Sequence, residues 1–267
     1  MKNLIYLLLL SMTIPSCKKE EARQVNQYTI EQFYTNTRFE GGTFSADETR
    51  LLVGSDETGI FNLYEITLAD GAKKQLTTST VESYYPVDYV PGMSALIYSA
   101  DKGGNEIDHL YLLEDNGKTT DLTPGENNKV SFFKWSEDKK SMFYISNIRD
   151  PKYFDVYKMN IGEWIPTLFY ENKSGLDVNE ISDDEKTLVV SKTVTTSENE
   201  LYLVNRETDT QTELSLPDQK GRYGVSGISK DSKYVFYLTD GGKEFTYLVQ
   251  YDMNSGERKV LYETNWD

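Results

Sequence analysis

One short pattern occurs four times in this sequence: Phe44-Ser45-Ala46-Asp47, Trp135-Ser136-Glu137-Asp138, Ile181-Ser182-Asp183-Asp184 and Ile228-Ser229-Lys230-Asp231. Each copy has an aromatic or aliphatic residue before Ser-x-Asp, and an apolar run such as Leu51-Leu52-Val53 comes soon after it. A fifth copy, Val90-Pro91-Gly92, keeps the turn but not the serine. The anchors are 46, 45, 46 and 47 residues apart; they are Ser45, Pro91, Ser136, Ser182 and Ser229. This regular spacing indicates five repeats of one structural unit.

Each repeat contains four short stretches that are separated by turn residues. Each stretch is either apolar or alternates between apolar and polar residues. In the first repeat these stretches are residues 38–44, 50–53, 61–67 and 74–77. Asx-Gly pairs such as Asp70-Gly71 are strong hairpin signals between such runs. No window shows the period of an amphipathic helix with caps at both ends. Four antiparallel strands in every 40 to 50 residues or so are typical of a β-propeller blade.

The sequence therefore predicts an all-β fold, a β-propeller of five four-stranded blades of about 46 residues each. The propeller domain is expected over residues 28–267, with blades near 38–77, 84–123, 130–170, 176–216 and 222–263. A β-sandwich is the competing architecture, but it would not require an equal period. Five blades could close into a ring or form part of a ring of seven or eight, and the sequence leaves this open.

The N-terminus has the pattern of an export signal. A basic start precedes the apolar run Leu4–Leu10, which is too short for a permanent membrane helix. Ile14-Pro15-Ser16-Cys17 follows and resembles a bacterial lipobox, in which Cys17 would be lipidated. We predict a signal peptide at residues 1–16, a lipidated polar tether at 17–27, and an exported lipoprotein of the periplasm or outer membrane. The alternative is an incidental or buried cysteine.

Composition excludes several classes of function. Acidic residues outnumber basic ones by 43 to 28, a net charge of −15, which argues against a nucleic-acid partner. The chain has one His and one Cys, so a disulfide framework is impossible, as are zinc sites that need several such ligands. We therefore expect no metal and no cofactor.

No catalytic residue is predicted. A Ser-His-Asp mechanism would depend on His109, which is expected to be an exposed or satisfied sheet histidine. The stretch most similar to a hydrolase nucleophile motif is Gly224-Val225-Ser226-Gly227-Ile228. It lies in an expected inner strand, and no histidine follows it in the sequence. No carboxylate pair of a glycosidase can be assigned either.

The loops after the second strand of each repeat are more polar and longer than hairpins require. Equivalent loops of all blades emerge on one face of a propeller, where they would bind a peptide or a partner domain, or would simply be solvated. The candidate residues of these rim loops are Glu57, Lys102, Asn105, Glu106, Arg149, Asp150, Asn199, Lys243 and Glu244.

Several of these stretches resemble the N-terminal propeller of prolyl oligopeptidase family serine peptidases, especially exported dipeptidyl- or acylaminoacyl-peptidase-like members. The resemblance covers about residues 28–267 and is carried by Phe44–Asp47, Glu57–Gly59, Leu76–Thr77, Tyr98–Glu106, Asp121–Glu126, Ser146–Asp150 and Tyr262–Asp267. In that family the propeller gates access to a C-terminal α/β-hydrolase domain with Ser, Asp and His. None of those catalytic positions exists in this sequence, so no catalytic residue is carried over.

The resemblance implies an extracytoplasmic, substrate-gating or peptide-binding domain that is non-catalytic by itself. Its partners would be a peptide substrate or the missing hydrolase domain, with the membrane contacted through the lipid anchor. Within a longer product it would belong to a serine peptidase. The blade motifs are shared with Tol-type propellers, so the alternative is a stand-alone periplasmic propeller that mediates protein–protein interaction.

Overall fold

The computed structural model describes residues 25–216 and 218–266. The chain divides after Thr37 into an N-terminal unit and the unit Arg38–Asp267. The described residues of the N-terminal unit contain one short helix, α1 (Ile30–Tyr34), which begins with a capping box between Thr29 and Gln32. The predicted signal peptide and Cys17 lie outside the described residues. Within the described ranges, no helix is sufficiently long and apolar to span a bilayer.

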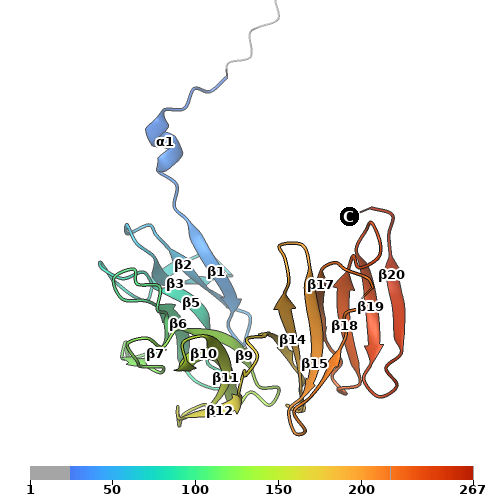
Figure 1. Cartoon of the computed structure of the whole chain (residues 1–267). Coiled ribbons are helices and arrows are strands. Elements are labelled where there is room, and N and C mark those ends of the chain that lie inside the picture. Colours follow the sequence, from blue (N-terminus) through green and yellow to red (C-terminus); the bar gives the residue numbers. More distant parts are fainter. Residues whose placement is uncertain (1–24, 217, 267) are drawn as a thin grey trace, which may run out of the picture. The chain divides into compact units, whose positions relative to one another are not determined.

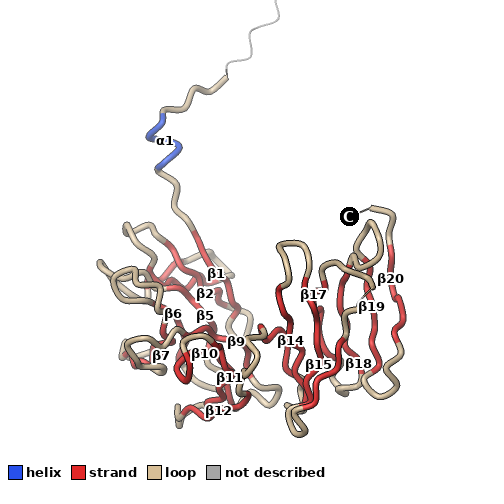
Figure 2. Tube along the Cα trace, in the orientation of Figure 1, coloured by secondary structure: helices blue, strands red, loops and turns tan. Residues whose placement is uncertain are grey.

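In the described part of the second unit, the strands form five four-stranded antiparallel sheets, each a meander of four consecutive strands (Figures 1 and 2). The first sheet contains β1 (Phe39–Phe44), β2 (Arg50–Ser55), β3 (Asn62–Thr67) and β4 (Lys73–Gln75). The second contains β5 (Tyr85–Tyr89), β6 (Ala95–Ala100), β7 (His109–Glu114) and β8 (Thr119–Asp121). The third contains β9 (Val130–Trp135), β10 (Ser141–Asp150), β11 (Tyr153–Asn160) and β12 (Pro166–Tyr170).

The fourth sheet contains β13 (Asp177–Ile181), β14 (Thr187–Thr193), β15 (Asn199–Asn205) and β16 (Thr210–Glu213). The fifth contains β17 (Tyr223–Ile228), β18 (Tyr234–Thr239), β19 (Tyr247–Asp252) and β20 (Arg258–Glu263). The predicted all-β fold of five four-stranded blades is confirmed. The predicted domain start at residue 28 lies before the first sheet, because α1 and its flanking residues precede β1.

The Ser-x-Asp motif builds the turn between the first and second strands of four sheets. Ser45 Oγ donates a hydrogen bond to Asp47 Oδ1 at 2.6 Å and accepts one from the Arg50 N–H at 3.0 Å. The same two contacts recur at Ser136, Ser182 and Ser229. The residue after each Asp has φ between 53° and 61°, a left-handed conformation that these side chain–backbone bonds hold in place. Hydrogen bonds from Ser45 and Thr49 lower the pKa of Asp47 to about 2, so its carboxylate is ionised at neutral pH.

In the second sheet the anchor is Val90, and the prediction of Pro91 was wrong by one residue. Val90 N–H donates to Ala95 O at 2.9 Å, as Ser45 N–H donates to Arg50 O at 2.9 Å in the first sheet. Proline has no N–H and cannot make this bond, so Pro91 takes the next position of the turn. Gly92 follows it with φ 71°, the sequence typical of a type II turn. The anchor spacings are therefore 45, 46, 46 and 47 residues.

The apolar cores lie between successive sheets. Leu96 and Tyr98 of β6 pack with the first sheet, whereas Ile97 between them packs with the third. Successive side chains of a strand point to opposite faces, so each sheet contributes to two cores. This arrangement explains why the second strands are continuous apolar runs such as Met142-Phe143-Tyr144 instead of alternating ones.

Polar contacts join the first strands of neighbouring sheets. Asp88 of β5 accepts a hydrogen bond from Thr43 Oγ1 of β1 at 2.7 Å and one from Trp135 Nε1 of β9 at 2.9 Å. Lys134 Nζ of β9 donates to Glu180 Oε1 of β13 at 2.6 Å. These contacts help to align the first four sheets against one another and so to place the loops at the sheet ends.

Candidate functional site

The nine predicted rim residues all lie at one end of their sheets, because each is at the end of a second strand, at the start of a third strand or in the loop between them. Glu57 follows β2; Lys102, Asn105 and Glu106 connect β6 to β7; Arg149 and Asp150 end β10; Asn199 begins β15; Lys243 and Glu244 connect β18 to β19. Strand direction alternates within each meander, so the loops that follow the fourth strands emerge at the same end.

Arg149 is held by the third sheet. Its Nε lies 2.6 Å from Asp155 Oδ2 and its Nη2 lies 2.9 Å from Asp155 Oδ1. Asp155 is fully buried and also accepts the Asn172 N–H at 2.8 Å. These charge-assisted bonds raise the pKa of the Arg149 guanidinium. Arg149 therefore joins the long β10–β11 hairpin to the segment after β12.

Other rim residues also contact the propeller itself. Asn199 exchanges two hydrogen bonds with the backbone of Tyr223, at 2.9 and 2.8 Å, and so links the fourth and fifth sheets. Glu57 forms an ion pair with Lys73. Lys243 lies 2.5 Å from Glu263 Oε2. These side chains are engaged by neighbouring strands, whereas Lys102 and Asn105 line a pocket.

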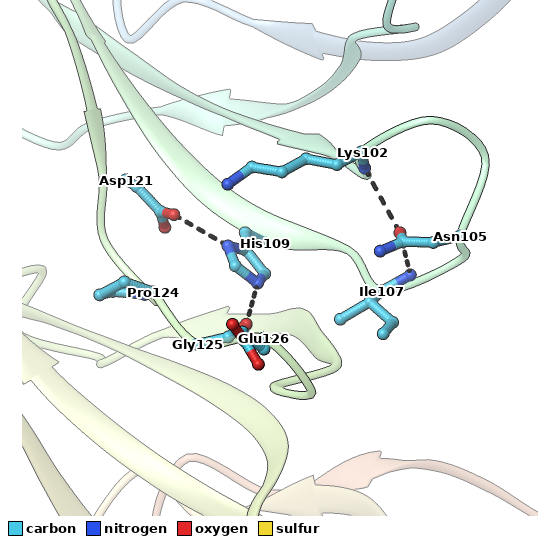
Figure 3. Close-up of a pocket in the computed structure, with 8 residues that line it drawn as sticks. All are labelled: Lys102, Asn105, Ile107, His109, Asp121, Pro124, Gly125 and Glu126. Atoms are coloured by element: carbon cyan, nitrogen blue, oxygen red, sulfur yellow. Dashed lines mark hydrogen bonds and ion pairs between the residues drawn. The ribbon is translucent and has the colours of Figure 1, made fainter.

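This pocket has a volume of about 390 Å³ and lies between two loops of the second blade (Figure 3). Its residues are Lys102, Asn105, Ile107, His109, Asp121, Pro124, Gly125 and Glu126. Figure 3 shows Asn105 and Ile107 on the β6–β7 loop and Pro124 to Glu126 on the loop after β8, with His109 between them. Asn105 Oδ1 accepts the Ile107 N–H at 3.0 Å, which shapes the first loop as an Asx turn.

His109 connects the two sides of the pocket. Its Nδ1 lies 2.8 Å from Asp121 Oδ2, and its Nε2 lies 2.9 Å from the Gly125 carbonyl oxygen. Only 7% of its side chain is exposed. Burial and the nearby charge of Asp121 raise the pKa of Tyr111, which stacks beside His109, to about 12. Of the two predicted alternatives, an exposed or a satisfied sheet histidine, His109 is the satisfied one, and both of its ring nitrogens are engaged in structural contacts.

The mouth of the pocket carries two opposite charges. Among the described residues, neither the Lys102 amine nor the Glu126 carboxylate has an ion-pair partner within 4.0 Å. Ile107 and Pro124 provide apolar walls beside them. An amphipathic, dipolar ligand such as a short peptide matches this combination of groups.

Asp121 and the Pro124–Glu126 loop were not among the predicted rim residues. Strand order could have indicated this loop, because the fourth strand of an antiparallel meander ends at the same end of the sheet as the loop that follows the second strand. Gly224–Ile228 lies in β17, so the serine within it is part of an inner strand and not of a strand-to-helix turn. In residues 25–216 and 218–266, no group of three or more His, Cys, Asp or Glu side chains could hold a metal ion.

A family profile described as "Prolyl oligopeptidase, N-terminal beta-propeller domain" matches residues 77–265, which contain the second to fifth sheets. The chain belongs to this family. The match includes both loops of the His109 pocket and confirms the resemblance in the sequence. No curated protein sequence matches this prolyl oligopeptidase-type propeller.

Solved structures share the fold of this prolyl oligopeptidase-type propeller. A prolyl endopeptidase matches 86% of the chain with a TM-score of 0.63 and 17% identity, over 37% of its own length. A puromycin-hydrolyzing peptidase from Mycobacterium tuberculosis matches 85% of the chain with a TM-score of 0.55 and 17% identity, over 38% of its own length. TolB from Acinetobacter baumannii matches 83% of the chain with a TM-score of 0.53 and 15% identity, over 53% of its own length. The chain thus spans about half of TolB and under two fifths of either peptidase.

Proposed function

We propose that this chain is an exported propeller that binds peptides at the His109 pocket and does not itself cleave them. The observation that carries the proposal is the pocket at the rim end of the second blade, which has apolar walls and is lined by two exposed side chains of opposite charge, Lys102 and Glu126. Membership of the peptidase propeller family supports peptides as the ligand class. The only histidine in the sequence, His109, contacts Asp121 and Gly125 through its two ring nitrogens, so both nitrogens are engaged in structural contacts.

A peptide would use the pocket in two ways. One apolar side chain would enter between Ile107 and Pro124, and polar backbone or terminal groups would meet Lys102 and Glu126. In a longer protein this pocket would select or guide substrates for a hydrolase domain. The second candidate is a stand-alone propeller that binds a segment of a partner protein, which the structural likeness to TolB favours.

We expect Ile107→Asp to weaken peptide binding by about tenfold or more, because one apolar contact in a pocket is worth roughly 1–3 kcal/mol. The measurement is fluorescence anisotropy of fluorescein-labelled tryptic casein peptides mixed with the purified chain. Met93→Asp is the matched control, because Met93 is 40% exposed in the turn between β5 and β6, at the other end of the second sheet. Equal binding by Ile107→Asp and the unchanged chain would refute the pocket as the site. Hydrolysis of a chromogenic peptide by the purified chain, retained through repeated purification, would refute the non-catalytic role.

We also propose that Cys17 anchors the chain to a membrane. The motivation is its place as the single cysteine, directly after an apolar run and Ile14-Pro15-Ser16. In bacteria that express the chain, a labelled fatty acid should enter the protein, and Cys17→Ser should abolish the label and release the chain from the membrane fraction. Labelling that persists in Cys17→Ser would show that the anchor is elsewhere or absent.

A further inference from the structure

The interfaces between successive sheets follow one pattern. We call the face of a sheet toward the preceding sheet its backward face and the face toward the following sheet its forward face. In the second, third and fourth sheets both faces pack on a neighbouring sheet. In the third sheet, Met142 and Tyr144 lie on the backward face and Phe143 and Val156 on the forward face. The turn anchors align the sheets residue by residue, so the equivalent positions in every other sheet can be named.

The forward face of the fifth sheet is partly exposed, since Phe236 and Leu248 on it are half-buried. Phe236 and Leu248 occupy the positions of Phe143 and Val156, as the anchor alignment and strand pairing show. Leu238 and Tyr262 pair with Leu248 across the sheet and are 45% and 65% exposed. Among the described residues, each apolar cluster joins two successive sheets, from the first and second to the fourth and fifth. None of these clusters includes the forward face of the fifth sheet.

Part of the backward face of the first sheet is exposed as well, whereas Val53 and Tyr64 farther along it are buried, at 5% and 1% exposed. Phe44, Leu51 and Ile66 form one cross-strand row on it, and Phe44 is 58% exposed. In the second sheet the same face carries Leu96 and Tyr98 and packs on the first. No described sheet packs on the Phe44 row, and the Lys73 amine, paired with Glu57, lies over the Phe39 and Tyr64 rings of this face.

We propose that these two faces bind each other between two copies of the chain, so that the first sheet of one copy packs on the fifth sheet of another. Every forward face buried in this structure contacts a backward face, and in the described residues the first sheet has the exposed backward face. The polar positions also match. In the third interface Lys158 Nζ lies 2.6 Å from Glu185 Oε1; the equivalent residues at the proposed interface are Gln250 and Glu48, an amide donor and a carboxylate.

This contact is heterologous, because it uses different surfaces on the two copies. Two consequences follow. A substitution that blocks either face in every copy should abolish the contact. A mixture of copies blocked on the first sheet with copies blocked on the fifth sheet should form a single contact, and therefore a dimer. An isologous dimer, made by two fifth sheets meeting each other, would not respond in this way. The net charge of −15 repels like copies, so added salt should strengthen the association.

The test is sedimentation velocity of the full chain carrying Cys17→Ser, which removes a lipid-driven route to association. We expect the apparent mass to rise with concentration to about twice that of the monomer or more. Leu238→Glu and Phe44→Glu should each remain monomeric, and an equimolar mixture of the two should form a dimer that grows no further. Leu168→Glu is the matched control, because Leu168 is 48% exposed on β12 of the third sheet and so belongs to neither of the two faces proposed to bind each other.

Leu238→Ser provides a variant that the fold should accept, because the fourth sheet has Ser191 at the equivalent position. Circular dichroism and a cooperative thermal transition confirm that each variant is folded. A chain that stays monomeric at every concentration and salt level overturns the proposal. Self-association of Leu238→Glu or Phe44→Glu alone, or a mixture that stays monomeric while the unchanged chain associates, overturns it as well.

Discussion

Replacement of Asp155 by alanine is expected to lower the free energy of unfolding by about 3–5 kcal/mol, as for other buried ion pairs from which one partner is removed. Asp155 is fully buried and accepts two bonds from Arg149 and one from the Asn172 N–H. Alanine would leave the Asn172 N–H without its acceptor and Arg149 without its partner. Because about one third of the Arg149 side chain is exposed, partial hydration should keep the loss near the lower end of the range.

Urea titration monitored by tryptophan fluorescence measures this loss. Asp155→Asn should cost less, because an amide oxygen can still accept the Asn172 N–H. Asp150→Ala is the control, since Asp150 accepts the exposed Lys152 N–H at 2.9 Å, and a change within about 0.5 kcal/mol is expected there. An unfolding free energy of Asp155→Ala close to that of the unchanged chain would show that the ion pair adds no stability.

Phe143→Ala is expected to destabilise the chain by about 3–5 kcal/mol, the usual cost of removing a buried aromatic ring. Phe143 is 1% exposed and belongs to the cluster between the third and fourth sheets. Its ring meets Phe169 edge-on with the ring centres 4.8 Å apart. The loss should be large because a propeller is stabilised by interfaces between nearest-neighbour sheets, and this cavity would lie inside one of them.

The matched control is Phe154→Ala, because Phe154 belongs to the same sheet but is 39% exposed. Its substitution should cost about 1 kcal/mol or less. The free energies come from urea titration of both variants, with the slope of each transition checked against that of the unchanged chain. Similar losses for Phe143→Ala and Phe154→Ala would mean that the interface contributes less than its burial indicates.

Repeated turn chemistry made the blades predictable. The Ser-x-Asp turns need only local hydrogen bonds, so the sequence around Ser45 and Ser136 predicts its own conformation. The second repeat shows the limit of this reasoning. Val90-Pro91-Gly92 reads as a turn, but only the bond from Val90 N–H to Ala95 O identifies Val90 as the anchor.

The candidate site was predicted less completely. Loop position indicated Lys102 and Asn105, and both line the pocket. Loop composition could not show that Arg149 would be bound by Asp155 or Asn199 by Tyr223, because these partners depend on how strands pair and sheets pack. Pro124–Glu126 was missed because it follows a fourth strand, and it reaches the pocket only through the meander of the second sheet.

The sequence is sufficient to predict the class of fold, the number of four-stranded units in the described chain and the end of each sheet that carries the polar loops. It could do so because strand periodicity, turn residues and repeat spacing act over a few residues. The tertiary structure alone decided which polar residues are free to meet a ligand and which apolar faces lack a neighbour. Leu248 and its equivalent Val156 have similar side chains, but a fourth sheet covers Val156 and no described sheet covers Leu248. Burial is a property of what packs against a residue, and that contact comes from segments distant in the chain.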